Sequence, residues 1–165
     1  MYSIFFNYWR KASFIFLLGL LLFCYVGLPD SIAFKHNGAG RPIGFIDKQT
    51  FFYVSVTIIV GLSLLFSLVK TQVAKINFEG LLKSSAWSKH EEQLKLILSG
   101  WLDAIPAFVN SYLVFVLLGL QTVNNEVSKN LDRDYTWFLI LGAVLFIVIL
   151  FSVPLRILLR PPSES

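Results

Sequence analysis

Four long apolar runs, separated by short clusters of polar residues, dominate the pattern of the chain. The runs cover residues 13–28, 51–69, 105–120 and 135–159, and the second contains no charged residue. Each run is close to the length that a helix needs to cross a hydrocarbon core of roughly 30 Å. The pattern therefore predicts an all-α integral membrane protein with four transmembrane helices.

The composition agrees with this prediction. Hydrophobic residues make up 56% of the 165 residues and charged residues 15%, whereas about a quarter of the residues are charged in soluble domains. So few charges cannot cover the surface of a globule in water. We expect residues 1–165 to form a single membrane domain surrounded by the lipid bilayer.

The first run has a second interpretation. It follows Arg10 and Lys11 and precedes the triplet Ser31-Ile32-Ala33, an arrangement that cleavable signal peptides also show. We expect the run to be retained as a transmembrane helix, with cleavage as the alternative.

The Lys and Arg residues predict the orientation. Two precede the first run, five lie in the loop at 70–104 and two lie at the C-terminal end, so nine of the fourteen share one side. Cytoplasmic loops carry an excess of Lys and Arg. We therefore expect an inner-membrane protein with both termini in the cytoplasm. Trp9, Trp101 and Trp137 stand at the edges of runs, as interfacial indoles do.

The segment 76–104 is predicted to be cytoplasmic and amphipathic. Ser88 to Glu91 has the sequence of a capping box, which predicts a helix that begins near Lys89. We expect this helix to lie along the membrane surface and to turn inward at Pro106. The apolar residues that recur at spacings of three and four are Leu94, Ile97, Leu98, Trp101, Leu102 and Ile105.

A few small or polar residues inside the runs are candidates for helix contacts. Thr57 and Gly61 are four residues apart, as are Ser63 and Ser67, and such pairs let membrane helices approach closely. Asn110 is the strongly polar residue at depth, and we expect it to form an interhelical hydrogen bond. No Asp, Glu, Lys or His falls inside the four runs, which argues against an intramembrane proton relay.

The sequence offers no motif for catalysis. No Ser-His-Asp set, metal-binding His spacing, paired acidic residues or phosphate-binding glycine motif can be assembled from it. The basic residues are scattered rather than gathered in a patch for nucleic acid. We expect a non-enzymatic chain with no cofactor, no metal and no nucleic-acid partner, in which the single cysteine, Cys24, serves packing.

The loop between the first two runs differs from the others because it is rich in turn-forming residues. Three glycines between residues 38 and 44 permit positive φ, and Pro29 and Pro42 fix bends. These residues predict a compact external loop over residues 29–48.

Nine positions in and beside this loop follow one pattern in register: Leu28, Pro29, Asp30, Ile32, Asn37, Gly40, Pro42, Phe45 and Lys48. In this pattern the chain resembles domain of unknown function 1648, found in bacterial membrane proteins that include immunity and signalling proteins of the Sdp-immunity type. The resemblance covers about residues 13–69. The chain departs from it at Ala33, Lys35 and Ile43, where the family has proline, histidine and aspartate.

The resemblance implies a function for the loop, because the better-known members protect a cell from a secreted toxin or relay its presence inward. Our leading hypothesis is a non-enzymatic inner-membrane protein whose external loop 29–48 contacts an envelope ligand or partner. The alternative is an accessory structural subunit of a larger inner-membrane protein complex. The expected contact residues are Pro29, Asp30, Asn37, Gly40, Pro42, Phe45 and Lys48.

Overall fold

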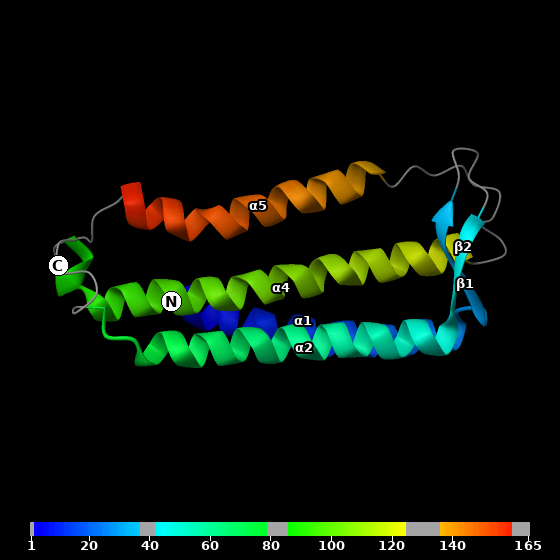
Figure 1. Cartoon of the computed structure of the whole chain (residues 1–165), viewed down its shortest axis with the longest axis horizontal. Helices are drawn as coiled ribbons and strands as arrows, with labels where there is room; N and C mark the ends of the chain where they lie inside the picture. The colour runs from blue at the N-terminus through cyan, green and yellow to red at the C-terminus, as the bar shows by residue number, and fades with distance from the viewer. Residues whose placement is uncertain (1, 37–41, 79–85, 125–135, 160–165) are drawn as a thin grey trace.

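The computed structural model of the chain describes residues 2–36, 42–78, 86–124 and 136–159. Within these residues four long helices lie side by side: α1 (Tyr2–Gly27), α2 (Lys48–Lys75), α4 (Glu91–Asn124) and α5 (Thr136–Leu159) (Figure 1). All four are long and apolar enough to cross a membrane. The prediction of a helical multi-pass membrane protein is confirmed at this level.

Two short strands, β1 (Ser31–His36) and β2 (Pro42–Asp47), form an antiparallel hairpin between α1 and α2. The hairpin runs across the ends of the helices rather than along them (Figure 1). The chain is otherwise helical over the described residues, as predicted, but the hairpin itself was not predicted, because a loop rich in glycine and proline shows no strand periodicity. The start of α1, the end of α5 and the short helix η1 (Ala86–Lys89) lie at the opposite end of the molecule (Figure 1).

The apolar core lies between α1, α2 and α4 and extends to the hairpin. In a bilayer such a core is stabilised by close van der Waals packing, since lipid tails are as apolar as the side chains. On α1 the buried positions recur at spacings of three and four, so one stripe of the helix faces its neighbours. The buried members are Leu17, Leu21, Cys24, Leu28, Ile32, Ile59, Val114 and Leu117.

α4 continues through Pro106 as one helix. The predicted surface helix that turns inward at this proline is therefore not observed. A proline inside a helix removes one N–H donor and favours a kink. Here residues 102–107 are all buried among neighbouring helices, and this packing keeps both halves of α4 in line. The segment 91–104 therefore belongs to the helix bundle, and the helix begins at Glu91, two residues after Lys89, close to the predicted start.

The first turn of α4 explains why the helix begins there. Glu91 and Glu92 place two negative charges at the positive end of the helix dipole. Glu91 also forms an ion pair with Lys95, one turn later. Residues 79–85 of the predicted amphipathic segment 76–104 lie outside the described part of the chain.

α5 packs on α4 through stacked aromatic rings. The rings of Tyr112 and Phe138 stack with centroids 5.1 Å apart. The Tyr112 ring lies against the backbone of α5 at Gly142, where a Cβ atom would overlap it. Glycine at position 142 therefore permits the close approach of the two helices.

Indole N–H groups also join the helices. Trp9 Nε1 donates to Ser111 Oγ at 3.1 Å, between α1 and α4. Trp101 Nε1 donates to the backbone carbonyl of Ile149 at 2.8 Å, between α4 and α5. Two of the three predicted interfacial indoles thus bond across helix contacts, while Trp137 is exposed at the start of α5.

Replacement of Gly142 tests the α4–α5 contact. Gly142→Ala is expected to lower the free energy of unfolding by about 1–3 kcal/mol, because the added Cβ displaces the Tyr112 ring from its stacked position. Thermal unfolding in detergent measures the change. Gly119→Ala is the matched control, since a Cβ there meets nothing within 4 Å. Equal melting temperatures for the two variants would contradict this packing.

Candidate functional site

The hairpin covers the end of the helix bundle with one face and turns the other face outward. Ile32 is fully buried in the core, and Ile46, its partner on β2, packs against the same cluster. Side chains alternate between the two faces of a sheet. The neighbouring pair, Ala33 and Phe45, therefore belongs to the other face, where Phe45 is exposed and Ala33 is buried.

The last residue of α4, Asn124, closes the outer edge of β1. Its Oδ1 accepts the backbone N–H of Ala33 at 2.8 Å, and its Nδ2 donates to the Ala33 carbonyl at 3.0 Å. Nδ2 donates also to the Leu120 carbonyl at 3.0 Å, and the side chain is buried. A carboxamide carries the same donor and acceptor as a peptide group. Asn124 therefore pairs with β1 as one residue of a third strand would.

Lys48 ties the base of the hairpin to α1. Its Nζ donates to the Leu28 carbonyl at 2.8 Å, and its backbone N–H donates to the Asp30 carbonyl at 3.0 Å. The ammonium also lies 5.3 Å from the centroid of the Tyr25 ring. The Asp30 carboxylate, 3.9 Å away, is fully exposed, and such surface ion pairs add little stability. The bond to the carbonyl that follows α1 is the stronger tether.

The hairpin presents three large apolar side chains, which we call the hairpin patch: Phe34, Ile43 and Phe45. Their exposed fractions are 60%, 55% and 56%. Gly44 makes this arrangement possible, because a Cβ there would lie 2.9 Å from Lys35 Cβ and 3.2 Å from Phe34 Cζ. The register shifts on both sides of the Lys35–Gly44 pair mark a local irregularity of the ladder at this close approach.

The structure places five of the seven predicted contact residues. Lys48 is half-buried and acts as a tether, and Asn37 and Gly40 lie outside the described residues. The sequence pattern did not single out Phe34 as a contact residue, although it joins Phe45 in the hairpin patch. The predicted contact residues that are exposed are Pro29, Asp30, Pro42 and Phe45.

The two predicted small-residue pairs of α2 lie in different surroundings. Ser63 is half-buried, and Ser67 Oγ accepts a hydrogen bond from Arg10 of α1 at 3.0 Å. Thr57 and Gly61 are exposed, and a Cβ on Gly61 would meet nothing within 4 Å. Helix packing at Thr57 and Gly61 stays a prediction that would need another chain.

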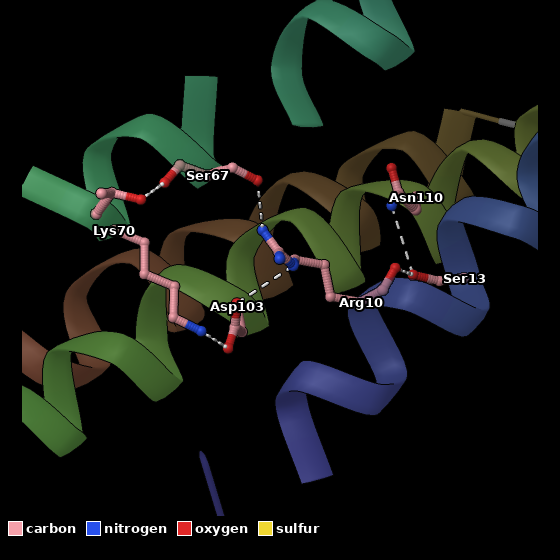
Figure 2. A network of polar contacts seen from close by, with 7 residues as sticks. Arg10, Ser13, Ser67, Lys70, Asp103 and Asn110 are labelled. Carbon is pink, nitrogen blue, oxygen red and sulfur yellow. Dashed lines mark hydrogen bonds and ion pairs between the residues drawn. The ribbon is translucent and has the colours of Figure 1, made fainter. Parts of the chain in front are cut away.

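Three helices meet at a buried carboxylate that the sequence analysis did not identify. Asp103 of α4 is fully buried, 3.2 Å from Nε of Arg10 on α1 and 2.6 Å from Nζ of Lys70 on α2 (Figure 2). A buried charge is costly unless it is paired. The two cations compensate the carboxylate, and the cluster links α1, α2 and α4.

A second polar contact adjoins this cluster. Asn110 Nδ2 donates to Ser13 Oγ at 3.5 Å, and Ser13 Oγ donates to the Arg10 carbonyl at 3.0 Å (Figure 2). The predicted interhelical hydrogen bond of Asn110 is confirmed, with α1 as the partner helix.

One signal in the sequence could have indicated the cluster. Arg10 precedes the first apolar run, Lys70 directly follows the second and Asp103 stands two residues before the third. In helices that alternate in direction, these three positions lie at one level. We expected such charges in solvated flanks, but α1, α2 and α4 all extend beyond the predicted runs and hold them inside the bundle.

Three of the four charged residues that line the cavity beside the cluster are already paired. A cavity of about 540 Å³ lies between α2 and the start of α4, with Lys70, Glu91 and Lys95 in its lining. Lys70 pairs with Asp103, and Lys95 pairs with Glu91. Among the described residues, no three His, Cys, Asp or Glu side chains gather as metal ligands would. The cluster joins α1, α2 and α4.

The sequence matches no protein-family model, no curated protein and no solved structure. The resemblance of the first loop to domain of unknown function 1648 therefore stays a prediction.

Replacement of Asp103 tests the cluster. Asp103→Asn is expected to lower the free energy of unfolding by about 3 kcal/mol, because it leaves Arg10 and Lys70 without their anion. Adding Lys70→Met should recover part of this loss. Lys95→Gln, which breaks the Glu91 pair on one helix, is the control and should cost about 0.3–0.5 kcal/mol. Unfolding in detergent provides the measurement, and similar losses for both single variants would rule out a structural role for Asp103.

Proposed function

We propose that this chain is a non-enzymatic protein of a bacterial inner membrane whose external hairpin contacts a ligand or partner in the envelope. The observation that carries the proposal is the hairpin patch. Single exposed apolar residues are common on any protein, but Phe34, Ile43 and Phe45 are all exposed on one short hairpin at the end of the helices. Several exposed apolar groups on one small element are typical of interaction sites.

The attachment of the hairpin supports the same proposal. Asn124 bonds to β1 from the end of α4, and Lys48 bonds to the end of α1. A surface that is ordered before binding loses less conformational entropy when a partner arrives. The patch is therefore suited to recognition, and the resemblance of the loop to immunity and signalling proteins favours the same function.

The distribution of Lys and Arg supports the orientation. In the proposed arrangement the hairpin is outside, and the start of α1 and the end of α5 are in the cytoplasm, on the side that holds nine of the fourteen basic residues. These two helix ends lie at the same end of the molecule (Figure 1), as an even number of spans requires.

Polar replacements in the patch test the proposal. A strain that lacks the chain is complemented with the wild type or a variant, and its survival is measured in spent medium of the parent strain. Phe34→Ser and Phe45→Ser should each lose the protection given by the wild type at unchanged abundance in the membrane, because the contact surface is lost. Phe5→Ser is the matched control, since Phe5 is 62% exposed and belongs to the first turns of α1, at the opposite end. Full protection by a variant that carries both Phe34→Ser and Phe45→Ser would refute the proposal.

One observation favours the alternative of an accessory subunit in a larger inner-membrane complex. The Thr57–Gly61 pair forms a small-residue surface on the outside of α2, with open space next to Gly61. Such a surface suits contact with another transmembrane helix. A stoichiometric partner that co-purifies in mild detergent, and is lost in Gly61→Leu, would favour this alternative.

A further inference from the structure

The hydrogen-bond pattern of the hairpin determines which backbone groups point away from it. The N–H of Lys48 donates to the carbonyl of Asp30, which makes these residues a hydrogen-bonded pair. In an antiparallel ladder bonded and non-bonded pairs alternate. The next bonded pair is therefore Ile32 with Ile46, two residues along each strand. The pairs in between direct their N–H and C=O groups outward, away from the partner strand.

Ala33 and Phe45 form one of these outward-directed pairs. The position of Asn124 agrees with this, because its carboxamide bonds to both the N–H and the C=O of Ala33. The edge of β1 is thus closed. The equivalent N–H and C=O of Phe45, on the edge of β2, bond to no group among the described residues. The hairpin has one closed edge and one open edge.

The open edge faces sideways along the membrane. Ile32 and Ile46 point from the inner face of the hairpin into the core between the helices. The sheet therefore lies flat over the helix ends, and its strands run across them (Figure 1). In a sheet with this orientation the edges lie in the plane of the membrane. Two copies inserted in the same direction would present their β2 edges at the same height.

We propose that two copies of this chain form a homodimer through their β2 edges. A two-fold axis parallel to the helices pairs β2 antiparallel with β2 of the second copy, with the two Phe45 residues as the central bonded pair. The result is a four-stranded sheet in the order β1-β2-β2-β1. Its two outer edges are both β1 edges, and Asn124 of each copy closes them. Most symmetric dimers form such isologous contacts.

Sheet stability also favours a second copy. A two-stranded hairpin is marginally stable by itself, and additional strands stabilise it. An open edge with exposed apolar side chains is a site where another strand tends to add. The dimer satisfies the open groups of Phe45 and brings Ile43 and Phe45 of both copies onto one outer face. This inference concerns assembly and does not rest on the proposed function.

A dimer that pairs through its β2 edges cannot also pack through the Thr57–Gly61 surface of α2. From Lys48 of one copy to Lys48 of the other, the paired strands span six residues, or roughly 20 Å at the rise of a β-strand. The two α2 helices therefore start too far apart to pack through Thr57 and Gly61. Gly61→Leu should leave the proposed dimer unchanged.

Cysteine cross-linking in native membranes tests the dimer. In a Cys24→Ser chain, Phe45→Cys should form a disulfide-linked dimer under mild oxidation by copper phenanthroline. Paired residues of this kind have Cα atoms about 5.5 Å apart, which suits a disulfide. Phe34→Cys is the matched control, because Phe34 is equally exposed but lies on β1. Three strand spacings, roughly 14 Å, would separate its two copies, so it should stay monomeric.

A second pair of variants tests the backbone contact. Phe45→Pro removes the outward N–H but leaves the hairpin ladder intact, whereas Phe45→Val keeps that N–H. Native mass spectrometry in mild detergent should show dimers for the wild type and Phe45→Val, and monomers for Phe45→Pro. A monomeric wild type without cross-linking at position 45, equal cross-linking at positions 34 and 45, or a dimer lost only in Gly61→Leu would each overturn the proposal. These readouts do not depend on the survival assay.

Discussion

The double hydrogen bond between Asn124 and the backbone of Ala33 is the constraint on which the external part of the molecule depends. It joins the last residue of α4 to β1, although 91 positions separate the two residues in the chain. The bond fixes the hairpin flat on the helix ends, with Ile32 in the core. It also closes one edge of the sheet and leaves the other open. Both the position of the hairpin patch and the proposed pairing of β2 follow from it.

α4 is the helix that connects the two ends of the molecule. At one end its Asn124 holds the hairpin, and nearer the other end its Asp103 holds Arg10 of α1 and Lys70 of α2. Half of its apolar span is buried, whereas α2 and α5 bury only small parts of theirs. The ion cluster fixes how α1, α2 and α4 are aligned along their axes, because a shift of one helix would separate the fully buried Asp103 carboxylate from its two cations. The outer faces of α2 and α5 remain for lipid or for other chains.

Hydropathy predicted the four helices because a long apolar run has few alternatives in a membrane protein. It could not predict the ends of α4: the helix continues past the apolar run to Asn124, which the sequence suggests is a loop residue. The Arg10, Lys70 and Asp103 cluster was missed because each charge stands beside a run, and only the alignment of three helices brings the charges together. The hairpin was not predicted because its own sequence suggests a loop. Hydrogen bonds from Asn124 at the end of α4 and from Lys48 hold this segment in place. The residues of the first loop were enough to single it out as a candidate contact site. Phe34 was added to that site only when the structure showed its side chain exposed on the hairpin.

Hydrogen exchange of the hairpin amides, measured with the protein in lipid nanodiscs, tests most directly whether α4 holds the hairpin in place. The comparison is between the wild type and Asn124→Leu, in which the carboxamide is lost. The amides of Ile32 and Ile46 are expected to lose their protection in the variant, while the amides of Leu17 and Leu21 in the core of α1 keep theirs. Unchanged protection of the hairpin amides in Asn124→Leu would show that α4 does not hold the hairpin in place.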